Sequence, residues 1–160
     1  VTASRVLQKM AACPDWNDGW HYGRPGMAAF MQGVRRNTLR VYGLERYLED
    51  HVPSADEREK LLQDNCAAWA SVFDPHSLAV LAGAAEIFDV RERLGEIKAR
   101  ILFAVSSTDL LFPPDEEAPR LLESLAVETR YTVLQSRYGH MASGLDWQKM
   151  EAELAWLLRC

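Results

Sequence analysis

Residues 100–109 read RILFAVSSTD, and this stretch decides the fold class. Its apolar run at 101–105 is short, continuous and bounded by polar residues, which predicts a strand buried on both faces of a sheet. A second strand is predicted at 130–135, RYTVLQ, and a terminal helix at 147–158. Prolines and acidic residues followed by leucines at 113–125 predict another helix between the strands. The sequence therefore predicts a parallel strand–helix–strand–helix unit of the α/β class.

Helices are predicted throughout the residues before this unit. Residues 1–12 predict a short helix that stops at Pro14, and residues 27–47 predict one or two helices because apolar residues recur without β-branched enrichment. Ser54 opens the capping-box pattern SADE, which starts a further helix. Asp-Pro at 74–75 is predicted to end that helix and start the next one.

The two predicted strands form only part of a sheet. A parallel sheet of two strands leaves both of its edges open and is not expected to be stable by itself. We therefore expect that another polypeptide segment supplies the remaining strands.

Composition excludes several classes of protein. The formal net charge is −5, and the 18 basic and 23 acidic residues are interspersed, so no basic stripe is available to bind nucleic acid. The apolar runs span a few residues, far fewer than the roughly 20 that cross a bilayer, so no membrane span is predicted. The cysteines show no CxxC pattern and the histidines no ligand spacing, so neither a disulfide framework nor a metal site is predicted.

The chain start, VTAS at 1–4, resembles neither a native start nor a secretory signal. It has no initiator Met, no basic segment and no apolar stretch. We expect that this start reflects processing, proteolysis or truncation. We also expect the protein to be cytoplasmic.

Polar loops follow both predicted strands. Asp109 lies in the loop after the first strand and His140 in the loop after the second. Because neighbouring parallel strands end at one edge of a sheet, about 5 Å apart, these side chains are expected to approach each other, with Gly139 allowing the tight turn before the imidazole. A carboxylate that accepts a hydrogen bond from imidazole Nδ1 leaves Nε2 to take a proton from a nucleophile. The two residues thus predict an acid–base pair that requires a serine.

Each residue of the pair also has a structural interpretation. An aspartate after a strand often caps the next helix, and a histidine there is often a hydrogen-bonded structural residue. The order of the two favours the functional interpretation, because α/β-hydrolases place their triad as serine, then acid, then histidine.

Four blocks of sequence carry a family resemblance. They are PDWNDG at 14–19, FDV at 88–90, DLLFPP at 109–114 and SRYGH at 136–140. In this order they resemble successive blocks of the homoserine O-acetyltransferase family, a branch of the α/β-hydrolase superfamily, over nearly the whole chain. The resemblance implies the C-terminal part of an α/β-hydrolase fold. In such a fold a helical cap precedes a βαβα unit that completes a sheet supplied by another segment.

The resemblance also implies a role for each segment. Residues 1–13 would form a core-linking helix, residues 14–90 the helical cap or lid, and residues 91–160 the C-terminal part of the hydrolase core. It further implies that Asp109 is the triad acid and His140 the triad base.

Three other positions bear on the substrate. The stretch TLR at 38–40 resembles a tunnel-lining Thr-Tyr-Arg of the family, which implies that Thr38 and Arg40 bind substrate. For Arg40, a solvent-exposed position on a cap helix is an equally good explanation. His140 is followed by Met141, whereas the amino-acid acetyltransferases of the family have an Asp there. An apolar Met141 beside the base favours a less polar acyl acceptor, or water, as in esterases.

The serine nucleophile is missing from the sequence. No Gly-x-Ser-x-Gly elbow occurs, and the serines of the helical region lie in helix or cap contexts rather than in a strained strand-to-helix turn. The oxyanion-hole donors normally accompany that elbow. We therefore expect this chain to be inactive alone and to need a complementary N-terminal segment or chain that bears both.

The predicted function is serine-dependent acyl transfer on esters, as an O-acetyltransferase or a carboxylic-ester hydrolase. Its substrates would be a small-molecule ester and an alcohol or water. No cofactor is expected, and an acyl-CoA or another acyl donor would serve as a substrate. Whether the protein forms a homodimer through the cap is left open. The alternative is a non-catalytic cap or binding subunit, which predicts a companion segment without a serine elbow.

Overall fold

The computed structural model describes residues 3–159. Val1, Thr2 and Cys160 lie outside the described residues, and with them the expectation about the chain start. Two compact units are present: the described residues up to Thr38 together with Val52–Asp89, and Leu39–His51 together with the described residues from Val90 onward. These units are defined by contacts within the chain, whereas the expected segments 1–13, 14–90 and 91–160 are defined by their roles in the hydrolase fold. The boundaries of the expected segments stay a prediction.

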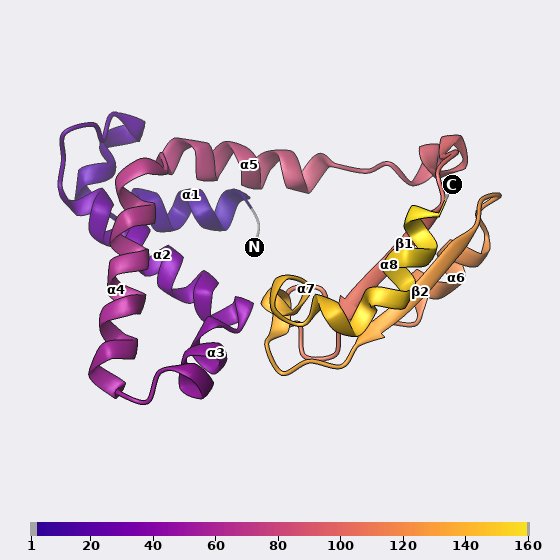
Figure 1. Ribbon diagram of the computed structural model, residues 1–160. Helices are drawn as coiled ribbons and strands as arrows, with labels where there is room; N and C mark the ends of the chain where they lie inside the picture. The colour runs from indigo at the N-terminus through magenta and orange to yellow at the C-terminus, as the bar shows by residue number, and fades with distance from the viewer. Residues whose placement is uncertain (1–2, 160) are drawn as a thin grey trace. The chain divides into compact units, whose positions relative to one another are not determined.

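The first unit is helical (Figure 1). Its elements are α1 (Ala3–Ala11), η1 (Pro14–Gly19), α2 (Gly26–Tyr42, whose last turn belongs to the second unit), α4 (Ala55–Val72) and α5 (Pro75–Ile87). The predicted helix starts are confirmed. Ser54 Oγ accepts a hydrogen bond from the Glu57 amide (3.2 Å), and Asp74 Oδ1 accepts one from the His76 amide (2.6 Å), with Pro75 at the first helical position.

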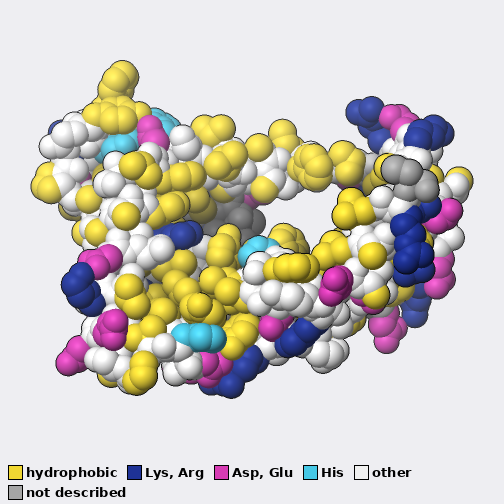
Figure 2. All heavy atoms as spheres, viewed as in Figure 1, with side chains coloured by type: hydrophobic (Ala, Val, Ile, Leu, Met, Phe, Trp, Pro, Cys, Tyr) yellow, Lys and Arg dark blue, Asp and Glu magenta, His cyan; other side chains and the backbone are white. Residues whose placement is uncertain are grey.

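Packing of α1 against α5 forms the core of this unit. Its buried residues are Val6, Met10, Trp16, Met27 and Ala79. Hydrophobic side chains also cover the surface of α5 (Figure 2), and that helix exposes Val80, Leu81 and Ile87, the last to 85%. Only part of the apolar surface of α5 is therefore buried within the unit.

The second unit holds the sheet. Its elements are α3 (Leu44–His51), η2 (Arg91–Glu96), β1 (Ile101–Ser106), α6 (Glu117–Glu123), β2 (Thr129–Leu134), η3 (Gly139–Met141), α7 (Ala142–Leu145), η4 (Trp147–Met150) and α8 (Glu151–Leu158). The strands β1 and β2 pair in parallel, with Ile101 opposite Thr129 and Ser106 opposite Leu134. The predicted pair of parallel strands is thus confirmed.

The helix between the strands is shorter than predicted. Asp115 Oδ1 accepts hydrogen bonds from the amides of Glu117 (2.8 Å) and Ala118 (2.7 Å), so α6 begins only after this turn. Pro113 and Pro114 consequently remain in the loop that follows Asp109 instead of opening the helix.

The predicted burial of β1 on both faces is wrong. Phe103 is 42% exposed and Ala104 is also exposed. The physical reason is that, among residues 3–159, β1 pairs only with β2, so its other edge and part of its surface meet no further strand.

Arg100 joins the last helix to the start of β1. Its guanidinium donates to the carbonyl oxygens of Trp156 (2.8 Å) and Arg159 (2.9 Å) at the end of α8 and lies 5.2 Å from the Trp156 ring centroid. These contacts satisfy carbonyls that a helix C-terminus leaves unpaired. Within the described part of the chain, none of the helices has the length and apolar character needed to cross a bilayer.

Candidate active site

The loops after β1 and β2 meet at one end of the sheet. Asp109 lies three residues beyond β1, and His140 lies in η3 beyond β2. Because the parallel register places Ser106 opposite Leu134, both strands end at the same level. His140 Nδ1 lies 2.9 Å from Asp109 Oδ2, so the two predicted residues form a hydrogen-bonded pair.

The Asp109 carboxyl group is buried, with 7% of the residue exposed. Its Oδ1 accepts hydrogen bonds from the amides of Leu111 (2.7 Å) and Phe112 (3.2 Å), while Oδ2 faces His140. Burial raises the pKa of Asp109, but the hydrogen bonds from His140, Leu111 and Phe112 outweigh it and hold the pKa below its ordinary value. Asp109 therefore closes a turn with one oxygen instead of capping the next helix, and contacts the imidazole with the other.

The ionised Asp109 decides the tautomer of His140. A carboxylate can only accept a hydrogen bond, so the contact at 2.9 Å places a proton on His140 Nδ1. Neutral imidazole then has its lone pair on Nε2. The His140 side chain is 34% exposed, so that nitrogen belongs to an accessible ring and not to a fully buried structural histidine.

A cavity of about 290 Å³ lies beside the pair. Its walls combine apolar side chains with a few polar ones; among them are Phe103, Val105, Ser106, Phe112, Ser143 and Met150. Two aromatic rings flank the imidazole of His140: the Tyr42 ring centroid is 4.8 Å away and that of Phe112 is 5.7 Å away. The predicted base therefore borders a largely apolar space that suits an acyl group.

Two of the predicted substrate-binding residues, Arg40 and Met141, do not line this cavity. Arg40 lines a second, more polar cavity of about 530 Å³, which Thr108 and Gly139 also border. Thr38 belongs to the first unit, where its hydroxyl donates to the Val34 carbonyl oxygen (3.0 Å). Met141 is half-buried in η3 and is not one of the residues lining the cavity beside His140. Among residues 3–159, no cluster of three or more His, Cys, Asp or Glu side chains could hold a metal ion.

Tyr42 and Phe112 were not predicted as site residues. Phe112 lies in the block at 109–114, so its proximity to Asp109 in sequence was a usable signal. Tyr42 stands at the end of α2, and nothing in its local sequence indicates contact with His140.

Two glycines adopt backbone conformations that side chains disfavour, and both lie in or next to the loop that carries His140. Gly139 has φ +55°, which confirms the tight turn predicted before His140. Gly43, between α2 and α3, has φ +92°, and a Cβ there would lie 2.7 Å from the Tyr138 carbonyl oxygen. The chain at 39–51 therefore packs against the loop that carries the histidine.

We expect Gly43→Ala to lower the free energy of unfolding by about 1–3 kcal/mol, because alanine disfavours this backbone conformation and its methyl group would displace the Tyr138 backbone. Urea unfolding followed by circular dichroism measures the change. Gly144→Ala in the same unit is the control, since a Cβ there meets nothing within 4 Å, and its effect should stay within about 0.5 kcal/mol. Equal effects of the two substitutions would contradict the close packing at Gly43.

Comparisons of sequence identify relatives. No family model matches the chain. The homoserine O-acetyltransferase of Geotalea daltonii is 33% identical over 99 residues, which cover 56% of this chain and 27% of that protein. The homoserine O-acetyltransferase of Methanohalophilus mahii is 30% identical over 152 residues, which cover 83% of this chain and 30% of that protein. The chain thus spans less than a third of the length of these relatives.

Comparisons of structure identify the fold. The crystal structure of homoserine O-acetyltransferase from Bacillus anthracis matches 99% of this chain and 48% of its own, with a TM-score of 0.72 and 19% identity. The crystal structure of esterase E22 matches 98% of this chain and 49% of its own, with a TM-score of 0.63 and 19% identity. The chain therefore has the fold of the C-terminal part of an α/β-hydrolase and is related in sequence to the homoserine O-acetyltransferase branch of that superfamily.

Proposed function

We propose that this chain supplies the acid and the base of a serine-dependent enzyme that transfers acyl groups from esters, as an O-acetyltransferase or a carboxylic-ester hydrolase. The observation that carries the proposal is the hydrogen bond of 2.9 Å between His140 Nδ1 and Asp109 Oδ2 beside an apolar cavity. The relatives named homoserine O-acetyltransferase and the structural similarity to an esterase support the same class of reaction.

In the first half of the proposed reaction, a serine hydroxyl attacks the carbonyl carbon of the ester. His140 Nε2 takes the hydroxyl proton as the new carbon–oxygen bond forms. Asp109, held ionised by its hydrogen bonds, orients the ring and stabilises the imidazolium. The bond to the leaving alcohol then breaks, and His140 returns the proton to the leaving oxygen, so that an acyl-serine remains.

In the second half, the acyl group passes to an acceptor. His140 Nε2 takes a proton from an alcohol or from water, which attacks the acyl-serine, and the serine leaves with that proton. We propose that Met141, which follows His140, favours an acceptor less polar than an amino acid. Thr38 and Arg40 are retained as proposed substrate contacts.

A complementary segment is part of the proposal, because a nucleophile and oxyanion-hole donors are required. The chain contains no Gly-x-Ser-x-Gly elbow. Among residues 3–159, one edge of β1 pairs with no strand, which supports the addition of at least one strand there. We propose that the strands on that side carry the serine.

An assay with a chromogenic acetate ester tests the proposal. This chain alone should leave the background hydrolysis unchanged, whereas the chain joined to a segment with a serine elbow should release the chromophore with a kcat of about 1 s⁻¹ or more. Repeating the assay with an added alcohol, homoserine among others, and comparing new ester with free acetate then distinguishes transferase from hydrolase.

The outcomes separate the enzyme from the alternative. A complementary segment without a serine elbow, or an assembled protein that leaves the ester intact, would establish a non-catalytic cap or binding subunit. Turnover by this chain alone would contradict the proposed division of the active site between segments.

A further inference from the structure

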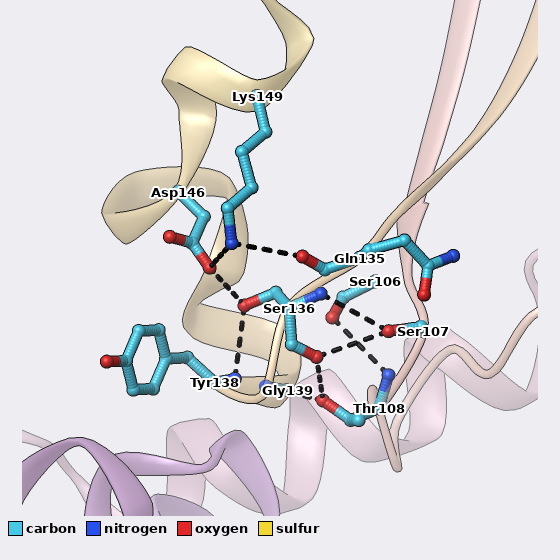
Figure 3. A network of polar contacts seen from close by, with 9 residues as sticks. All are labelled: Ser106, Ser107, Thr108, Gln135, Ser136, Tyr138, Gly139, Asp146 and Lys149. Atoms are coloured by element: carbon cyan, nitrogen blue, oxygen red, sulfur yellow. Dashed lines mark hydrogen bonds and ion pairs between the residues drawn. The ribbon is translucent and has the colours of Figure 1, made fainter. Parts of the chain in front are cut away.

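The loops that carry Asp109 and His140 are joined by a network of side-chain hydrogen bonds (Figure 3). At its centre is the hydroxyl of Thr108. Thr108 Oγ1 donates to the Ser136 carbonyl oxygen (2.8 Å) and accepts from the Gly139 amide (3.1 Å). Since Thr108 directly precedes Asp109 and Gly139 directly precedes His140, one hydroxyl connects the two residues adjacent to the pair.

The far side of the histidine loop is fixed independently. Ser136 Oγ donates to Asp146 Oδ2 (2.5 Å) and accepts from the Tyr138 amide (3.1 Å), and Lys149 Nζ lies 3.0 Å from the same Asp146 oxygen (Figure 3). The hydrogen bond from Ser136 and the Lys149 ammonium outweigh burial and lower the pKa of Asp146. Ser136 and Tyr138 are therefore held from one side, and the position of Gly139 relative to Asp109 depends on Thr108.

We propose that Thr108 is a positioning residue that sets the distance between His140 Nδ1 and Asp109 Oδ2. Its hydroxyl donates one hydrogen bond and accepts another, and both of these bonds join the two loops. Without it, the Gly139 amide loses this partner, and the adjacent His140 can move away from the buried carboxylate. A displacement of about 1 Å is enough to break a hydrogen bond of this length.

Ser107 provides a matched control. Its Oγ donates to the Ser136 carbonyl oxygen (3.2 Å) and accepts from the Ser136 amide (3.3 Å), so it joins the same two loops. It forms no bond to Gly139, however. Loss of the Ser107 hydroxyl tests loop cohesion alone, and loss of the Thr108 hydroxyl also tests the placement of His140.

The experiment compares Thr108→Val, Thr108→Ser and Ser107→Ala in this chain joined to its serine-bearing segment, with the chromogenic acetate ester. We expect Thr108→Val to lower kcat about 10- to 100-fold with KM changed less than about twofold, because the variant misplaces a base without removing a substrate contact. Thr108→Ser should restore most of kcat, and Ser107→Ala should retain it. A second readout is the Nδ1 proton of His140 in NMR spectra, which should exchange with solvent faster in Thr108→Val only.

Three results would overturn the inference: wild-type kcat and proton exchange in Thr108→Val, an equal loss in Ser107→Ala, or no recovery in Thr108→Ser. Thr108→Ala, which removes the hydroxyl without a new methyl contact, replaces the valine variant if that variant does not fold. The inference rests on the proposed function, but the two fail differently. An inactive wild-type protein would reject the function, whereas the proton-exchange comparison would still decide the role of Thr108.

Discussion

His140→Ala is expected to lower kcat of the assembled protein toward an acetate ester by about 10⁴- to 10⁶-fold. Within the pair, the imidazole is the accessible proton acceptor, because the Asp109 carboxylate is buried and uses both oxygens in hydrogen bonds. Without His140 Nε2, the serine hydroxyl has no acceptor for its proton and the leaving oxygen has no donor. Initial rates at pH 7, with enzyme concentration high enough to resolve the residual rate, measure the loss.

His51→Ala is the matched control for this variant. His51 lies in α3 of the same unit, is exposed, and contacts the Tyr47 carbonyl oxygen through Nδ1 (2.7 Å). Its removal should change kcat by no more than about twofold. Added imidazole should recover part of the activity of His140→Ala, since a free base can enter the space left beside Asp109. Activity of His140→Ala near the wild-type level would show that the base is misassigned.

The contact between Asp109 and His140 could be predicted from sequence because it depends on local patterns. The apolar run at 101–105 and the segment RYTVLQ at 130–135 predicted two strands, and parallel pairing places the residues just beyond them at one edge. Asp109 and His140 lie close together because both follow strands that end at that edge. The exposure of Phe103 was not predictable in the same way, since burial of a strand depends on which neighbours cover it and not on its own composition.

The residues around the pair depend on contacts between distant parts of the chain. Tyr42 is the last residue of α2 and contacts His140, and the next residue, Gly43, lies against the Tyr138 backbone. Helical periodicity predicts that a helix exists but not which loop its last turn contacts. Likewise, the role of the Thr108 hydroxyl depends on the path of the loop at 136–140, since its partners lie about 30 residues away in sequence. Arg40 and Thr38 were proposed from a three-residue resemblance, which carries no such geometry.

Asp109→Asn is expected to lower kcat by about 10³- to 10⁴-fold at pH 7, and the reason lies in the hydrogen bonds of the carboxyl group. Oδ1 accepts from the amides of Leu111 and Phe112, so the carbonyl oxygen of the introduced amide must take that place. Its NH₂ group then faces His140 Nδ1 and donates to it. This contact forces the imidazole proton onto Nε2, the nitrogen that must accept the serine proton.

The acid dependence of stability gives an independent measure of the same carboxylate. The pKa of Asp109 is lower in the folded protein than the value of about 3.9 in an unfolded chain, so its ionised form stabilises the fold at pH values above that number. This contribution is lost as pH falls through the lowered pKa. The difference in unfolding free energy between wild type and Asp109→Asn, from urea titrations at several pH values, should therefore be constant near neutral pH and shrink below about pH 3.9. A difference that does not change with pH, together with wild-type kcat in the variant, would mean that Asp109 only closes its turn and does not act on His140.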